Sequence, residues 1–229
     1  LAVLTWAPAA SSLAGKRYLF RTAADFVAAY TGIPKRPLLT AREMTLPDLN
    51  AGGLLVAGSY VGKTSAQLDT LFRRLPGLER VEISVDDLLH KDRGAAEIRR
   101  CADTVERCLA SGRSVALFTS RLLVTGQNPA ENLAIGETIS AGVVEVVRSL
   151  SAPPRWMIAK GGITSSDVAT RALGIRRATV LGQALPGVPV WLPGSESKWP
   201  GLPYIVFPGN VGDSESIATL VASLDTRQV

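Results

Sequence analysis

The sequence predicts an α/β fold in which a largely parallel β-sheet is covered by helices on both faces. Short apolar runs alternate with segments whose apolar residues follow helical spacing. Several of these runs end directly in glycine, serine or threonine, as parallel strands do where they turn into a helix. Apolar residues make up 46% of the 229 residues and charged residues only 20%, so the chain can form a substantial core.

The first 50 residues follow a different pattern from the rest. A short strand is predicted over residues 17–21 and a helix over residues 23–30. Residues 34–49 then form a polar connection that contains proline. We therefore expect a tail and linker over residues 1–50 and the main domain over residues 51–229.

From residue 53 onward, strands and helices alternate regularly. The predicted strands are residues 53–57, 80–84, 114–119, 156–159, 178–181, 188–191 and 204–207. The predicted helices are residues 64–75, 93–110, 132–150, 164–173 and 214–224. This alternation implies βαβ crossovers, which make neighbouring strands parallel and bring their carboxyl ends to one edge of the sheet. Ligands of such sheets bind beyond that edge.

The most informative turn is Lys-Gly-Gly-Ile-Thr-Ser-Ser-Asp over residues 160–167, between a predicted strand and a predicted helix. Gly161 and Gly162 carry no side chain, so the backbone can approach a ligand closely. Thr164 or one of its polar neighbours can cap the helix, whose unpaired N–H groups attract an anion. The turn therefore indicates a phosphate site.

Three further turns follow predicted strands and should lie at the same edge. They are Gly58-Ser59, the Thr-Ser-Arg of residues 119–121, and the Pro-Gly-Asn-Val-Gly of residues 208–212. Their shared position makes a nucleotide-sized cleft more credible than a single turn would. The fold class is therefore that of a Rossmann-like nucleotide-binding domain.

Residues 58–64, Gly-Ser-Tyr-Val-Gly-Lys-Thr, approach a P-loop in composition. The P-loop has four residues between its glycines, and this segment has three, so its backbone cannot wrap phosphates in the same way. Thr64 is better interpreted as the cap of the following helix, with Gln67 at capping-box spacing. Lys63 stays a candidate phosphate contact.

The formal net charge of +5 comes from lysines and arginines scattered along the chain. A nucleic-acid partner is not predicted, because its binders usually carry a basic stripe with base-reading elements, and small phosphorylated ligands fit better. No apolar run of about 18 residues indicates a membrane span. The first residues, from Leu1, lack the basic segment of a signal peptide, which favours a cytoplasmic protein.

The cysteine and histidine pattern indicates neither a disulfide nor a metal site. Cys101 and Cys108 lie seven residues apart in a predicted helix, a rise of about 10.5 Å, which is too far for a disulfide. His90 is the only histidine, and with Asp86 and Asp87 it is expected to form a local solvated or capped cluster rather than part of a catalytic triad. No metal ligands are predicted.

Three of these motifs together resemble the four-carbon acid sugar kinase family, specifically its C-terminal nucleotide-binding domain. Residues 58–59 resemble the glycine-serine turn of the family, and residues 160–165 resemble its Gly-Gly-x-Thr turn. Residues 202–212 resemble its C-terminal glycine-asparagine-x-glycine loop. The resemblance runs from residue 53 to the end, and residues 17–27 resemble the tail of the preceding acid-sugar-binding domain.

The resemblance implies ATP and Mg²⁺ as cofactors. The nucleotide contacts it implies are Ser59, Gly161, Gly162, Ile163, Thr164 and Gly209. The candidate phosphate contacts beside them are Lys63, Arg121 and Lys160. No catalytic base is identifiable.

Two departures limit the resemblance. Many members carry glutamate where this chain has Ile163, so any role of that carboxylate toward metal or ribose is absent. The Asp-Asp-x-Thr-Gly motif that opens the family's N-terminal domain does not occur. We therefore expect a chain that lacks the N-terminal domain and can bind nucleotide without completing the reaction.

The sequence therefore predicts ATP-dependent phosphorylation of a tetronate-like four-carbon acid sugar, with this chain as the ATP-binding half that is inactive alone. The expected partners are ATP, a small acid sugar and the missing N-terminal domain, and a homodimer is left open. The alternative is a non-catalytic module that holds a nucleotide or a sugar phosphate. An NAD-dependent oxidoreductase is disfavoured, because no G-x-G-x-x-G turn follows a strand.

Overall fold

The computed structural model describes residues 15, 17, 19–22, 24–34, 36–46, 50–58, 62–121 and 124–225. The chain divides into two compact units, Leu1–Pro37 and Leu38–Val229. The prediction that residues 1–50 are the tail of another domain and a linker stays a prediction.

The first unit contains one described helix, α2 (Ala24–Thr31). The rings of Phe20, Phe26 and Tyr30 lie together, with centroids 5.5 to 5.9 Å apart. The prediction of a strand over residues 17–21 is wrong. The residues of this range that the structure describes belong to no strand. A strand needs a hydrogen-bonded neighbour, and Leu19 is fully exposed here rather than packed against one.

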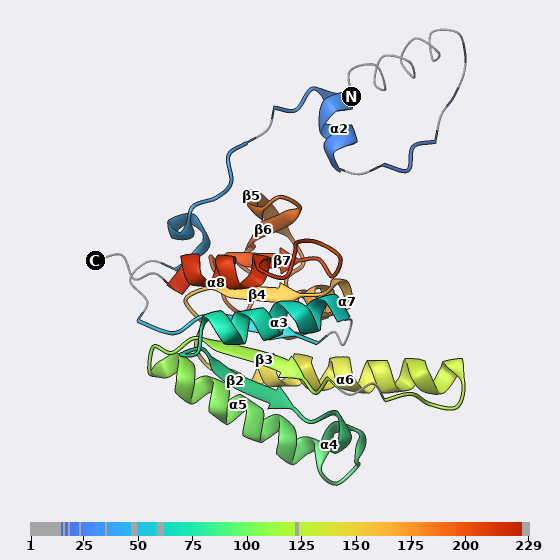
Figure 1. Cartoon of the computed structure of the whole chain (residues 1–229), viewed down its shortest axis with the longest axis vertical. Coiled ribbons are helices and arrows are strands. Elements are labelled where there is room, and N and C mark those ends of the chain that lie inside the picture. Colours follow the sequence, from blue (N-terminus) through green and yellow to red (C-terminus); the bar gives the residue numbers. More distant parts are fainter. Residues whose placement is uncertain are drawn as a thin grey trace. The chain divides into compact units, whose positions relative to one another are not determined.

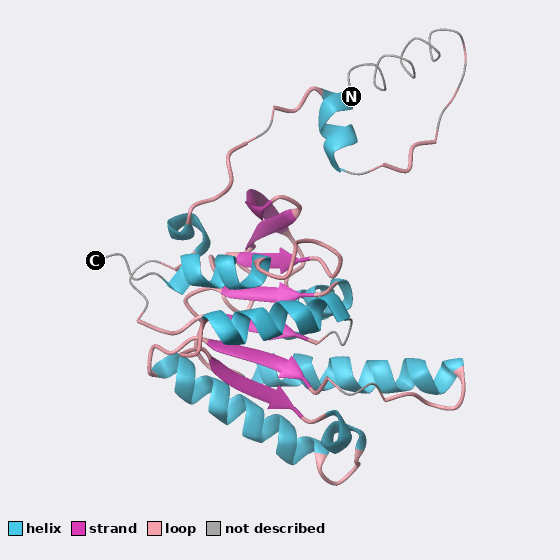
Figure 2. Cartoon of the chain, viewed as in Figure 1, coloured by secondary structure: helices cyan, strands magenta, loops and turns pink. Residues whose placement is uncertain are grey.

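The second unit is built on one β-sheet, shown in magenta in Figure 2. Its described strands are β1 (Leu54–Ala57), β2 (Glu79–Ile83), β3 (Val115–Thr119), β4 (Met157–Lys160), β5 (Ala178–Leu185), β6 (Val188–Pro193) and β7 (Tyr204–Phe207). Their order across the sheet in the described chain is β2-β3-β1-β4-β7-β6-β5. The pairs β2–β3, β3–β1, β1–β4 and β4–β7 are parallel. The predicted α/β fold with a largely parallel sheet is confirmed.

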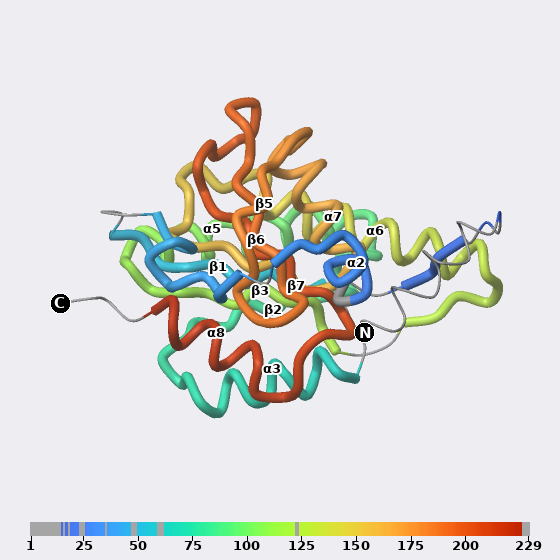
Figure 3. The backbone as a smooth tube through the Cα atoms, turned by 90° about the horizontal axis from the view of Figure 1, so that it is seen from above, coloured from blue at the N-terminus to red at the C-terminus, as the bar shows by residue number. Residues whose placement is uncertain are grey.

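Helices cover both faces of this sheet, as Figure 3 shows in a view from above. On one face lie α3 (Gly62–Arg74), α8 (Ser216–Asp225) and the 3-10 helix η1 (Ala41–Met44). On the other lie α4 (Val85–Leu89), α5 (Gly94–Ala110), α6 (Pro129–Ser149), α7 (Gly162–Asp167) and the π-helix η2 (Val168–Ala172). All four residues of β1 are buried, because each of its faces packs against one of these helical layers.

Strands β5 and β6 form an antiparallel hairpin at one edge of the sheet. Only Pro186 and Gly187 connect them, and a two-residue connection cannot make the crossover that parallel strands require. Gly187 supplies the positive φ, +80°, that such a tight turn uses.

Helix α6 begins three residues before its predicted start. The side chain of Asn128 accepts a hydrogen bond from the backbone N–H of Glu131, and Pro129 occupies the first turn, so both residues favour this start. Figure 1 shows that the N-terminal half of α6 extends past the carboxyl ends of the parallel strands. This projecting half of α6 lies beside the edge where the predicted site lies. No helix among the described residues is long and apolar enough to cross a membrane.

We expect the apolar face of α3 to contribute more to the free energy of unfolding than the projecting half of α6. Leu71 is fully buried, so Leu71→Ala should lower the free energy of unfolding by about 2–5 kcal/mol. The matched control Leu133→Ala, at a side chain that is 65% exposed, should change it by less than about 0.5 kcal/mol. Urea denaturation followed by circular dichroism measures both, and equal losses would contradict this packing.

Candidate functional site

The carboxyl ends of four neighbouring parallel strands bring the predicted turns together. Gly58 follows β1, Ser120 follows β3, Gly161 follows β4 and Pro208 follows β7. In the register of the sheet, Lys160 pairs with Ala57 on one side and with Phe207 on the other, so these three strands end level. The turns after them therefore lie side by side, as the sequence predicts.

The turn after β4 presents unpaired backbone donors. Gly161 has φ 105° and ψ 147°, a conformation that only glycine adopts readily, and its N–H donates to the carbonyl oxygen of Phe207 at 2.9 Å. Among the described residues, the backbone N–H groups of Gly162, Ile163 and Thr164 have no hydrogen-bond acceptor. Three donors from successive residues form the kind of backbone site that binds an anion.

Lys160 holds the loop after β7, residues 208–213, which we call the C-terminal glycine loop. The Nζ atom of Lys160 donates to the carbonyl oxygens of Pro208 at 2.8 Å and Gly209 at 3.1 Å. It also lies 4.6 Å from the ring centroid of Phe207. The side chain is completely buried, so these contacts replace the water that an ammonium group would otherwise bind.

Lys63 holds the same loop from the start of α3. Its Nζ donates to the carbonyl oxygens of Asn210 at 3.1 Å and Gly212 at 3.2 Å. Burial, and then the positive charge of Lys63, lower the pKa of Lys160 to about 8. Both predicted phosphate contacts thus hold loop carbonyls in this structure, and their contact with phosphate stays a prediction.

Thr64 and Gln67 do not cap α3, contrary to the sequence prediction. The helix begins at Gly62, so Thr64 lies inside its first turn, fully buried, and its Oγ1 has no hydrogen-bond partner among the described residues. Gln67 instead donates from Nε2 to the carbonyl oxygens of Val211 at 3.3 Å and Asp213 at 2.7 Å. The capping-box spacing led to the wrong role for Gln67, whose side chain holds the C-terminal glycine loop.

Arg121 lies after β3, one strand further from the turn after β4. Its Nη2 and Nε donate to Oγ of Ser65 at 2.7 and 3.2 Å, and burial lowers its pKa. Arg121 does not line the cavity beside the turn after β4. Its contact with phosphate also stays a prediction.

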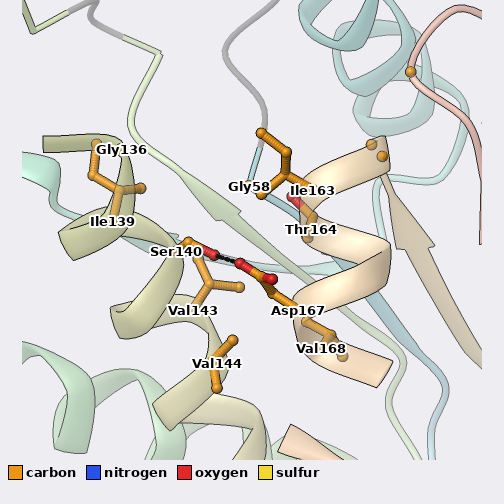
Figure 4. Close-up of a pocket in the computed structure, with 13 residues that line it drawn as sticks. Gly58, Gly136, Ile139, Ser140, Val143, Val144, Ile163, Thr164, Asp167 and Val168 are labelled. Atoms are coloured by element: carbon orange, nitrogen blue, oxygen red, sulfur yellow. Dashed lines mark hydrogen bonds between the residues drawn. The ribbon is translucent and has the colours of Figure 1, made fainter. Parts of the chain in front are cut away.

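A cavity of about 360 Å³ opens beside the turn after β4 and continues between α6 and α7 (Figure 4). At the edge of the sheet it is lined by Gly58, Gly161, Gly162 and Gly209, and the rest of its lining comes from α6, α7 and the start of η2. Its size lies within the roughly 300–1,000 Å³ typical of small-molecule sites. A second cavity of about 340 Å³ also touches Gly58 and reaches the end of β3.

Five of the six predicted nucleotide-binding residues line this first cavity. They are Gly161, Gly162, Ile163, Thr164 and Gly209, contributed by the turns after β4 and β7. The sixth, Ser59, lies outside the described residues. The structure brings the five together, and their contact with nucleotide stays a prediction.

Sequence reasoning missed the part of the cavity that α6 contributes. Ser140 Oγ donates a hydrogen bond to Asp167 Oδ2, which links α6 to α7 across the cavity (Figure 4). Ile139 and Val143 flank Ser140 along the same helix face. No local motif signals this pairing, because the two partners lie 27 positions apart in the chain.

The acidic and histidine side chains that the structure describes do not gather into a metal site. In the described part of the chain, no group of three histidine, cysteine, aspartate or glutamate side chains lies together. Arg93 pairs with Asp86 at 2.8 Å and Asp87 at 2.7 Å, and His90 contacts the backbone of Asp86, so the predicted local cluster is confirmed. The chain therefore offers Mg²⁺ no ready set of carboxylates among these residues.

A largely parallel sheet with glycine turns, unpaired amides and a cavity at its carboxyl edge defines a nucleotide-binding α/β domain. The family model described as "nucleotide-binding C-terminal domain" matches residues 54–217, and the chain belongs to this family. The predicted resemblance to the nucleotide-binding domain of four-carbon acid sugar kinases is confirmed at the level of the family. No curated protein is a significant match to the sequence.

Solved structures share this fold at low sequence identity. A domain of unknown function (DUF1537) from Bordetella bronchiseptica, a domain-swapped dimer with bound citrate, is 19% identical with a TM-score of 0.60 over 78% of this chain and 43% of its own. A Haemophilus influenzae protein of the same DUF1537 family is 19% identical with a TM-score of 0.59 over 87% and 45%. A Salmonella typhimurium protein, provisionally described as a tRNA synthase, is 19% identical with a TM-score of 0.60 over 81% and 42%. The chain spans less than half the length of these proteins.

Lys160 should make nucleotide binding depend on pH. Its pKa of about 8 means that the ammonium group is mostly charged at pH 7 and mostly neutral at pH 9.5, and the charged form attracts an anion more strongly. We expect the affinity for ATP, measured by calorimetry, to fall several-fold between pH 7 and pH 9.5. Lys160→Met should bind more weakly at pH 7 and lose this pH dependence.

The control for this experiment is Lys91→Met, which removes an exposed lysine that lines no part of the cavity. It should keep the affinity and the pH profile of the parent chain. A Lys160→Met variant with the full pH dependence would show that another group titrates.

Proposed function

We propose that this chain is the ATP-binding half of a kinase that phosphorylates a four-carbon acid sugar of the tetronate type. The observation that carries the proposal is the set of unpaired amides at Gly162, Ile163 and Thr164, which open onto a cavity of about 360 Å³. The family adds support through its nucleotide-binding domain. The identity of the sugar comes from the sequence resemblance alone.

The arrangement suits phosphoryl transfer, in which the protein mainly positions two partners and neutralises charge. In this proposal the amides of residues 162–164 donate to the phosphate oxygens, and Gly161 and Gly209 let the chain approach them closely. Backbone donors are fixed before the reaction, so they stabilise developing charge without reorganising. Lys160 and Lys63 add positive charge behind the C-terminal glycine loop.

The acid sugar and the group that activates its hydroxyl belong, in this proposal, to a second domain. The chain spans 43% of the Bordetella structure, which leaves room in such a protein for a domain of that kind. The Bordetella protein is a domain-swapped dimer, and we extend to this chain the proposal of a homodimer. Mg²⁺ would be bound mainly by the phosphates of the nucleotide.

A non-catalytic nucleotide-binding module is the second candidate. It is favoured by Ile163, an apolar side chain that is 75% exposed at the mouth of the cavity, at a position where sugar kinases of this type often carry glutamate. The two candidates differ in turnover. Supplying the acid-sugar-binding domain and a tetronate to the ATP-bound chain should release ADP if the chain is half of a kinase, and should release none if it is a module.

Gly162→Val tests the phosphate site directly. No atom lies within 4 Å of the position that a Cβ would take at Gly162, so the side chain should fit the fold while it occupies the approach to the amides. We expect ATP affinity measured by calorimetry to fall at least tenfold, with the melting temperature changed by only a few degrees.

Gly77→Val is the matched control. A Cβ at Gly77 would also meet no atom within 4 Å, and this glycine lies before β2, at the opposite edge of the sheet. This variant should bind ATP as the parent chain does. Unchanged affinity in Gly162→Val would remove the turn after β4 from the site and with it the basis of the proposed function.

A further inference from the structure

The cavity has two chemically different ends. One end is the glycine edge with its unpaired amides, to which the proposed function assigns the phosphates. The other end lies between α6 and α7 and contains side chains instead of backbone donors. Because the cavity is continuous, a nucleotide whose phosphates bind at the first end would direct its base toward the second.

The walls of the second end are apolar. Ile139 and Val143 of α6 lie on one side, and Ile163 and Val168 lie on the other (Figure 4). The side chain of Ile163 is 75% exposed, and a bound planar ring would cover it. Apolar side chains of this kind suit the two faces of an aromatic base.

The polar groups between these walls are Ser140 and Asp167. Ser140 Oγ donates its proton to Asp167 Oδ2, and Nη1 of Arg171 lies 3.6 Å from the same oxygen. Among the described residues, the other carboxylate oxygen, Oδ1, has no hydrogen-bond partner. The hydroxyl has used its only donor, so both side chains can now only accept hydrogen bonds.

We propose that Ser140 and Asp167 read the base of the nucleotide and select one that carries an exocyclic amino group, as adenine does, over one with a carbonyl at the same position. An amino group offers two N–H donors to the carboxylate and hydroxyl oxygens, whereas a carbonyl oxygen would face them without a hydrogen. A buried polar group left without its partner is costly, which is the source of the selectivity. This inference rests on the proposed function.

The decisive experiment compares ATP with inosine triphosphate, which has a carbonyl in place of the 6-amino group and a hydrogen on N1 where adenine has none. Calorimetry on the chain should give an affinity for ATP about tenfold or more above that for inosine triphosphate. In Asp167→Asn, the side-chain amide can donate to the carbonyl, so the ratio of the two affinities should fall to about one or reverse. Asp103→Asn, at an exposed position of α5, should keep the parent ratio.

The outcomes separate this inference from the proposed function. Equal affinity for the two nucleotides in the parent chain would overturn the base-reading role and leave nucleotide binding intact. Absence of binding to both would overturn both. A purely structural role of the Ser140–Asp167 link predicts that Asp167→Asn lowers the melting temperature but keeps the affinity ratio, and that result would also overturn the inference.

Discussion

The buried ammonium group of Lys160 is the interaction on which the site depends. It sits at the end of a central strand with no exposure to water, and such a group is tolerated only where acceptors surround it. The carbonyl oxygens of Pro208 and Gly209 provide these acceptors. The chain after β7 must therefore turn its carbonyls inward toward β4, and this fixes Gly209 beside Gly161 at the rim of the cavity.

Two side chains of α3 complete this support from the other direction. Lys63 and Gln67 bind further carbonyls of the C-terminal glycine loop, so the loop is tied to both β4 and α3. Lys63 and Lys160, which the sequence analysis predicts to contact phosphate, thus donate hydrogen bonds to backbone carbonyl oxygens of the protein itself. The positive character of the rim comes from the unpaired amides of residues 162–164 and from two ammonium groups that loop carbonyls hold, that of the buried Lys160 and that of the exposed Lys63.

The sequence predicted the elements whose signals are local. Apolar runs that end in glycine, serine or threonine identified the parallel strands, and the shared edge followed from the βαβ crossovers that make neighbouring strands parallel. The prediction of a strand at residues 17–21 was wrong because a strand needs a neighbouring strand, which a local sequence pattern does not reveal. The roles of Gln67 and of the Ser140–Asp167 link were missed for the same reason, since each joins segments far apart in the chain.

The two ends of the cavity place different demands on the sequence. Backbone amides and glycines can bind phosphate whatever the surrounding side chains are, so the phosphate end of the proposed site places few demands on those side chains. The end between α6 and α7 depends on the identity of Ser140, Ile163 and Asp167, and a change at any of them alters what fits. Nucleotide binding is therefore a property that the family description gives, whereas the choice of base, in our proposal, depends on the side chains that this chain places between α6 and α7.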